Sequence, residues 1–355
     1  MPTAKVPLPS DATPPTIGAL RSATAAVVAL LVGEFFRLEH TNLAVWTTHM
    51  VMTQYAFSSF QKGVERVLGR GLGILGGLVL LTLWRNTITV AYVLEAVSLL
   101  VFFYIYFSNR LAYTFLNAGL YMAVIIDLGR TNPEAVFPEG WALFLAIVVG
   151  VVVANLVSWY TGLERDLTIH TEGLPLWPVD GERLEHSVLL VAAVALALGV
   201  TDWLALPTTT TLVSVMLLVI TPDIHELVWK GELRLAGALL AAAYALLALI
   251  LLVRLPHFSL LAALLFLGMY LGAYLARAGG QRSYAGVQMG LVLPMVLVVP
   301  PADCGNMSSA TSRLLGVVIA IGCSMVVSLV AAVFWGRESR RQAATANAAA
   351  AGGKE

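Results

Sequence analysis

Two segments of the chain repeat one pattern of basic residues. Lys62 and Arg66 are four residues apart, and the pattern returns 168 residues later as Lys230 and Arg234. Four residues is about one helical turn, so each pair shares a helix face. A guanidinium binds a carboxylate through two parallel hydrogen bonds, so Arg66 and Arg234 are candidates to gather organic anions at the cytoplasmic mouth of a pathway. The alternative is an anchor whose long side chains reach the lipid headgroups, and this is our interpretation of the two lysines.

A second repeated element combines an aromatic residue with an amide. Tyr113 and Asn117 recur 171 residues later as Tyr284 and Gln288, and Arg282 lies just before the second copy. One turn of helix separates the ring from the amide, so both could line a substrate path, with Arg282 as a further cation for a carboxylate. The alternative is that the amides form hydrogen bonds between closely packed helices.

Two ionisable residues fall inside apolar stretches. A charge at the centre of a bilayer is costly, so such residues are usually functional or neutralised. Glu95, near the middle of the fourth stretch, is the first candidate for carrying a proton, although a protonated, silent carboxyl is also compatible with its position. His49 has a reference pKa suited to proton relay, whereas the alternative is a packing residue.

The composition excludes an ordinary soluble protein. Of 355 residues, 59% are hydrophobic and 12% are charged, against roughly 45–50% and about 25% in soluble domains. The formal net charge is zero, so no field attracts nucleic acid. The chain lacks the phosphate loop of ATPases and the common metal and hydrolase motifs, so we expect no enzyme, no cofactor and no metal.

The elements that position these residues are apolar stretches of the sequence, which are long enough to cross a bilayer as helices. A spanning helix needs roughly 20 apolar residues. The sequence therefore predicts an all-α polytopic membrane protein with about twelve transmembrane helices. We expect a disordered N-terminus (1–16), a first six-helix repeat (17–160), a linker (161–185), a second six-helix repeat (186–335) and a disordered tail (336–355). The spans are expected at 17–36, 42–57, 67–84, 87–107, 111–128, 141–160, 186–201, 204–221, 235–253, 257–276, 283–300 and 311–335.

The basic residues predict the orientation of these helices. With the N-terminus inside, sixteen Lys and Arg residues lie on the cytoplasmic side and five on the other. Since Lys and Arg are retained in the cytoplasm, both termini are expected there. An even number of spans in each repeat makes the two copies parallel, related by an axis along the membrane normal.

The basic, glycine-rich segments 62–77 and 230–237, together with 282–288, resemble the fusaric acid resistance family, also called aromatic acid exporters. The resemblance implies proton-driven export of aromatic carboxylic acids across a bacterial inner membrane, with a possible periplasmic adaptor and a small membrane partner. The family is also similar to plant aluminium-activated malate channels. In contrast to the longer exporters, we expect no large cytoplasmic domain after either group of helices, only the linker 161–185 and a short tail.

We expect the partners to be membrane lipid and a small organic anion, with a possible homo-oligomer and no nucleic acid. Three hypotheses about function follow. The first is a proton-driven exporter of aromatic carboxylic acids or related toxic compounds. The second is a passive organic-anion channel built on the same basic residues. The third is a membrane scaffold that does not transport.

Overall fold

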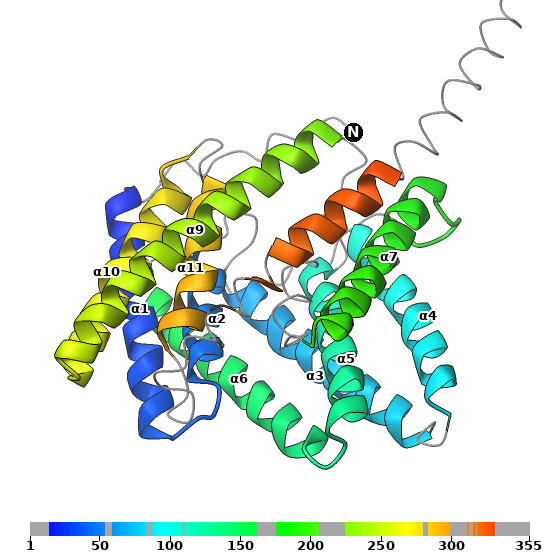
Figure 1. The fold of residues 1–355 in the computed structure, drawn as a ribbon, viewed down its shortest axis with the longest axis horizontal. Helices are drawn as coiled ribbons and strands as arrows, with labels where there is room; N and C mark the ends of the chain where they lie inside the picture. Colours follow the sequence, from blue (N-terminus) through cyan, green and yellow to red (C-terminus); the bar gives the residue numbers. More distant parts are fainter. Residues whose placement is uncertain are drawn as a thin grey trace, which may run out of the picture.

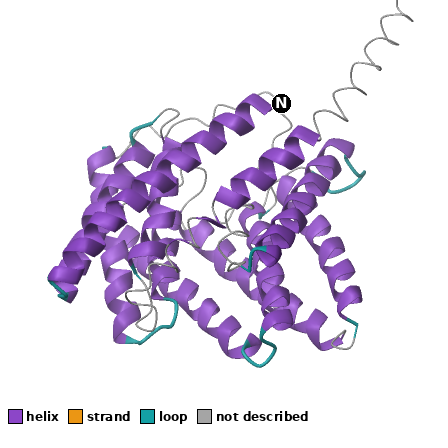
Figure 2. Ribbon diagram, viewed as in Figure 1, coloured by secondary structure: helices purple, strands orange, loops and turns teal. Residues whose placement is uncertain are grey.

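In the computed structural model, the described residues form helices joined by short loops and turns (Figure 2). The described residues are 14–53, 59–83, 87–108, 111–161, 175–205, 224–279, 283–298, 311, 315–316 and 318–330. The helices within these ranges are α1 (Pro15–Phe35), α2 (Thr41–Thr53), α3 (Ser59–Leu83), α4 (Ile88–Phe107), α5 (Ala112–Thr131), α6 (Val136–Tyr160), α7 (Gly181–Trp203), α9 (Ile224–Arg254), α10 (Phe258–Arg277) and α11 (Ser283–Leu297). A short apolar helix, Val318–Val330, follows α11.

Seven helices in the described part of the chain are long and apolar enough to cross a membrane: Pro15–Phe35, Phe60–Leu83, Ala112–Thr131, Val136–Tyr160, Gly181–Trp203, Gly231–Arg254 and Phe258–Arg277. Helices lie at eleven of the twelve expected positions, and the expected span at 204–221 falls almost wholly outside the described residues. The apolar parts of α4 and α11, and the helix Val318–Val330, are shorter than a full span. The structure is therefore an all-helical multi-pass membrane protein, and the count of twelve spans stays a prediction.

Helix α9 packs small residues inward and large apolar residues outward. On α9, Ala238 and Ala241 are buried, whereas Leu239 and Leu247 are exposed, Leu247 by 64%. A soluble helix would place the leucines in the core. Lipid tails are as apolar as leucine, so membrane helices associate through small residues that let their backbones approach. The distribution on α9 thus fits a lipid-facing surface.

The helix pair that carries the first basic segment has a counterpart in the second half. α3 packs along α5, and α9 packs along α11. At Gly69 of α3, an added Cβ would meet the carbonyl oxygen of Thr114 and the Cβ of Asn117. At Gly237 of α9 it would meet the corresponding atoms of Ala285 and Gln288. The two sequence repeats therefore form the same close helix contact, with the glycine in each case admitting a neighbouring backbone.

Contacts between the two halves also occur in matching pairs. α1 packs against α10, and α4 packs against α7, at opposite sides of Figure 1. With a repeat offset of about 170 residues, α10 corresponds to α4 and α7 corresponds to α1. The two contacts thus join corresponding helices of the sequence repeat.

Candidate functional site

Arg66, on α3, lies beneath the surface among aromatic side chains. It is 2% exposed. Its guanidinium carbon is 4.8 Å from the ring centre of Trp46 and 5.5 Å from that of Tyr113. Its Nη1 donates to the Tyr113 hydroxyl at 3.4 Å, a long hydrogen bond. Lys62, one turn earlier, is also buried, so the expectation that it reaches the headgroups is wrong. Close packing of α3 covers both side chains.

Arg70, one turn after Arg66, is completely buried. Its guanidinium carbon lies 3.5 Å from the ring centre of Tyr121. None of its three guanidinium nitrogens has a hydrogen-bond partner among the described residues. A buried charge without hydrogen bonds is costly, while its five N–H donors suit an anion. The sequence analysis did not select Arg70 as a site residue, although its position one turn from Arg66 was the available signal.

Glycines on α3 determine how closely these arginines approach the rings of α5. At Gly73, as at Gly69, an added Cβ would meet the backbone of α5, here the carbonyl oxygen of Ala118. Two helices in backbone contact leave no room for a long side chain between them. We infer that this contact holds Arg66 and Arg70 beside Tyr113 and Tyr121.

In the second half of the chain, Arg66 has a counterpart and Arg70 does not. Arg234 of α9 is 4% exposed, and its Nη2 donates to the Tyr284 hydroxyl at 2.8 Å. The guanidinium carbon lies 4.9 Å from the Tyr284 ring centre. The position equivalent to Arg70 is Ala238. The two halves therefore share one arginine and tyrosine pair, and the additional buried guanidinium belongs to the first half.

Tyr106 of α4 lies near residues of both pairs. It is close enough to interact electrostatically with Tyr113, Tyr284 and Arg234. The arginine and tyrosine pairs of both halves thus approach one region of the molecule. Tyr106 was not selected from the sequence, because no repeat or motif marks it.

The two amide residues of the repeated element are both buried. Asn117 Nδ2 donates to the carbonyl oxygen of Tyr113 at 2.6 Å, within its own helix, while its Cβ faces Gly69. Its hydrogen bond therefore does not join two helices. The Cβ of Gln288 faces Gly237 in the same way. Arg282 lies outside the described residues.

The two candidates for proton coupling occupy different places. His49 of α2 is fully buried. Its Nδ1 lies 3.4 Å from the Ser22 hydroxyl of α1, and its ring contacts Gly290 of α11. Glu95 of α4 instead lines a cavity between α4, α5 and α7. The structure therefore gives no single cluster that contains both residues.

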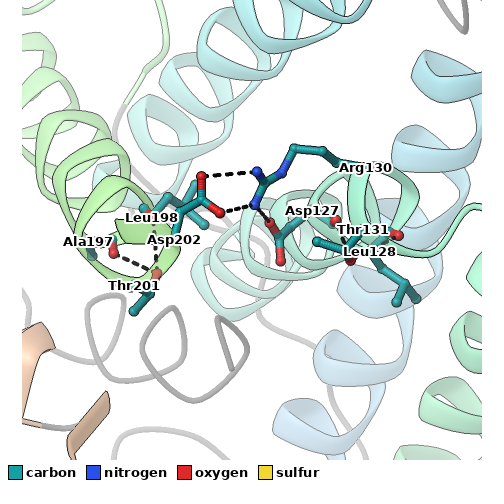
Figure 3. Close-up of polar contacts among 8 residues, drawn as sticks. All are labelled: Asp127, Leu128, Arg130, Thr131, Ala197, Leu198, Thr201 and Asp202. Atoms are coloured by element: carbon teal, nitrogen blue, oxygen red, sulfur yellow. Dashed lines mark hydrogen bonds and ion pairs between the residues drawn. The ribbon is translucent and has the colours of Figure 1, made fainter. Parts of the chain in front are cut away.

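The cavity beside Glu95 has a volume of about 540 Å³ and is bordered by charged residues. Arg130 donates to both carboxylate oxygens of Asp202, at 2.7 and 3.0 Å, and to Asp127 at 3.1 Å, as Figure 3 shows. These contacts join α5 to α7. The sequence analysis did not select this cluster, because only the packing of the two helices brings Arg130 to Asp202.

One group of side chains has the composition of a metal site. Glu39, His40 and Glu139 place their ligand atoms within 4.8 Å of one another. His40 Nε2 lies 2.7 Å from a carboxylate oxygen of Glu139, and Glu39 is exposed. The contact between His40 and Glu139 accounts for the proximity of these two residues without an ion.

Helices with lipid-facing leucines around buried arginine and aromatic clusters define a multi-pass membrane protein. Residues 17–166 match the model of the fusaric acid resistance protein family, a family of membrane transport proteins. The resemblance expected from the sequence is confirmed over these residues, which contain α1 to α6 and with them Arg66, Arg70 and Glu95. Comparison with curated proteins and with solved structures gave no match.

Proposed function

We propose that the protein is a proton-driven exporter of organic, mainly aromatic, carboxylic acids. The observation that carries this proposal is Arg70, a buried guanidinium that lies on an aromatic ring and whose nitrogens have no hydrogen-bond partner within the described residues. A carboxylate would supply the missing acceptors through two parallel hydrogen bonds. An aromatic ring attached to that carboxylate would pack against the aromatic side chains of Trp46, Tyr113 and Tyr121.

The two halves take different parts in this proposal. Arg66 and Arg70 bind the carboxylate in the first half, and Arg234 offers a second position in the other half. Tyr113, Asn117, Tyr284 and Gln288 line the passage between these positions, and Arg282 is a further cation that attracts the carboxylate. Tyr106, within electrostatic range of the pairs in both halves, lies on the route between them.

Coupling to protons is assigned to Glu95, with His49 as a second candidate. Glu95 is 4% exposed and lines a cavity, which supports this role. His49 lies where α2 of the first half contacts α11 of the second. A change in its protonation would therefore act at a contact between the halves, which rock against each other in alternating access.

The proposed arrangement in the cell is two parallel six-helix repeats in a bacterial inner membrane, with both termini in the cytoplasm. The excess of basic residues on one side supports this orientation. A periplasmic adaptor, a small membrane partner and a homo-oligomer belong to the same proposal, from the family resemblance.

The test is transport by the purified chain in lipid vesicles. Vesicles loaded with labelled benzoate, salicylate or fusaric acid are followed with and without a proton gradient. We expect saturable flux that the gradient accelerates and that Arg70→Met reduces at least tenfold. Arg254→Gln is the matched control, because Arg254 is an exposed arginine at the end of α9.

Each alternative has its own outcome in this assay. Flux that does not saturate and ignores the gradient would replace the exporter with an anion channel. Absence of flux for every acid would favour a scaffold. Glu95→Gln separates coupling from binding: it should abolish the effect of the gradient while leaving acid exchange between the two sides of the membrane.

A further inference from the structure

The cavity between α4, α5 and α7 is separate from the arginine cluster and has a different chemical character. Its wall is mostly apolar, with side chains from three helices that include Leu99, Ala123, Val194 and Leu198. Its volume, about 540 Å³, lies in the range of about 300–1,000 Å³ that is typical of sites for small molecules. The walls come from both halves of the chain, since α7 follows the linker.

The charged groups at this cavity are mainly acidic. Glu95, Asp127 and Asp202 supply three carboxyl groups, and Arg130 supplies one guanidinium. That guanidinium already donates to Asp202 and Asp127, as Figure 3 shows. An anion in the cavity would meet carboxylates and a cation that is already paired, so the lining disfavours anions.

Glu95 is the polar group most deeply placed in the cavity wall. Its side chain is 4% exposed, and its carboxyl makes no hydrogen bond or ion pair with any described residue. A buried carboxylate without a partner is costly, and a cation beside it would offset that cost. Tyr92, one turn before Glu95 on the same helix, also lines the cavity and offers an aromatic ring, to which cations are attracted.

We propose that this cavity binds a small amphipathic organic cation, with its ammonium group against Glu95 and its apolar part against the walls from α5 and α7. The inference goes beyond the export of carboxylic acids and uses no arginine of the first site. Its test measures binding rather than transport, so it can succeed or fail whatever the outcome of the export assay.

The experiment compares three probes of the same shape that differ in charge. Labelled benzyltrimethylammonium is the cation, neopentylbenzene is its neutral counterpart, and phenylacetate is an anion of similar size. Binding to the purified full chain is measured by equilibrium dialysis in detergent. We expect saturable binding of the cation, at least tenfold tighter than that of the other two. Equal binding of all three would overturn the proposal, because it would mean only partition into apolar surface.

Two variants test the place of binding. Glu95→Gln should weaken the affinity for benzyltrimethylammonium at least tenfold, and Glu34→Gln, which changes an exposed carboxyl on α1, should leave it unchanged. Ala195→Trp fills the cavity from its α7 wall at an exposed position and should abolish binding with Glu95 intact. Unchanged affinity in the folded Ala195→Trp protein would contradict the assignment even if Glu95→Gln failed to fold.

Discussion

Arg130 on α5 donates two hydrogen bonds to the carboxylate of Asp202 on α7, at 2.7 and 3.0 Å. The first residue lies in the part of the chain that matches the transport family, and the second lies beyond the linker. The ion pair, drawn in Figure 3, therefore joins the two halves of the chain. Both of its residues line the cavity beside Glu95. If the two halves of a transporter move against each other, either this ion pair breaks or α5 and α7 move together.

Reversal of the charges should reveal how much this pair contributes. Both side chains are partly exposed, so water screens their attraction and the contribution of the pair is small. We expect Arg130→Asp and Asp202→Arg each to lower the free energy of unfolding, and the double reversal to recover most of the loss. Chemical unfolding in detergent measures all three. Additive losses in the double variant would mean that the pair contributes no coupling.

The glycines of α3 give a sharper prediction about packing. Gly69→Ala places a methyl group against the carbonyl oxygen of Thr114, and backbone cannot rotate away as a side chain can. We expect a loss of about 1–3 kcal/mol. Gly71→Ala, two residues along the same helix, meets only Phe144 Cε2 at 3.6 Å. This control should raise stability by up to about 1 kcal/mol, because alanine loses less backbone entropy. A similar effect of both variants on the unfolding free energy would refute the close contact.

The helices and the residues of the two repeated elements could be predicted, because apolar runs and internal repeats can be read directly from the sequence. Apolar runs of about 20 residues mark membrane helices, and the spacing of Arg66 to Tyr113 returns in Arg234 to Tyr284 within three residues. Each of these pairs forms a contact in the structure. The repeats indicated which residues recur, whereas the contact of each arginine with its tyrosine follows from the packing of α3 on α5 and of α9 on α11.

The burial of these residues and the cavity could not be predicted in the same way. Lys62 looked like an anchor because lysine usually reaches water, yet α3 packs its basic face inward. Arg130 and Asp202 are 72 residues apart, and no local spacing indicates that the ends of α5 and α7 lie together. Side chains that meet only through the packing of distant helices leave no periodic signal in one sequence.

The two tyrosine hydroxyls should differ in their importance. Arg234 donates to Tyr284 at 2.8 Å, whereas the corresponding distance from Arg66 to Tyr113 is 3.4 Å. Hydrogen bonds to charged groups contribute about 1.5–3 kcal/mol when well formed. Tyr284→Phe is therefore expected to cost about 1.5 kcal/mol or more of unfolding free energy, and Tyr113→Phe less than about 1 kcal/mol. Chemical unfolding in detergent measures both variants. If Tyr113→Phe lowers the free energy of unfolding as much as Tyr284→Phe does, the difference between the two distances does not affect stability.

Acid should weaken the start of α7 through Asp180. This residue caps the helix by accepting from the backbone N–H of Glu182, and Arg183 Nε donates to it at 2.9 Å. The Arg183 hydrogen bond holds the pKa of Asp180 below its ordinary value. A carboxyl with a lowered folded pKa stabilises above its unfolded pKa, near about 4, and loses that contribution as the pH falls through the folded value.

Asp180→Asn isolates this contribution, because asparagine also caps helices but carries no charge. The thermal midpoint of the variant should fall less steeply than that of the wild type below about pH 4. Glu134→Gln, which changes an exposed carboxyl at the α5 to α6 connection, is the control and should follow the wild type. Parallel curves for Asp180→Asn and the wild type would remove Asp180 from the acid response.

Arg70 allows structural and functional roles to be separated in one variant. Its guanidinium is fully buried, and none of its nitrogens has a hydrogen-bond partner in the described part of the chain, so it weakens the unliganded fold. Methionine has a similar length and no charge, and replacement of buried ionic groups by apolar ones is often neutral or stabilising by about 1–4 kcal/mol. We therefore expect Arg70→Met to unfold at the same or a higher denaturant concentration while its transport of aromatic acids falls. Arg66→Met, which also loses a hydrogen bond to Tyr113, should be less stable than Arg70→Met. A clear loss of stability in Arg70→Met would show instead that the stacking of this guanidinium on Tyr121 holds α3 to α5, and the buried charge would then need no anion to explain it.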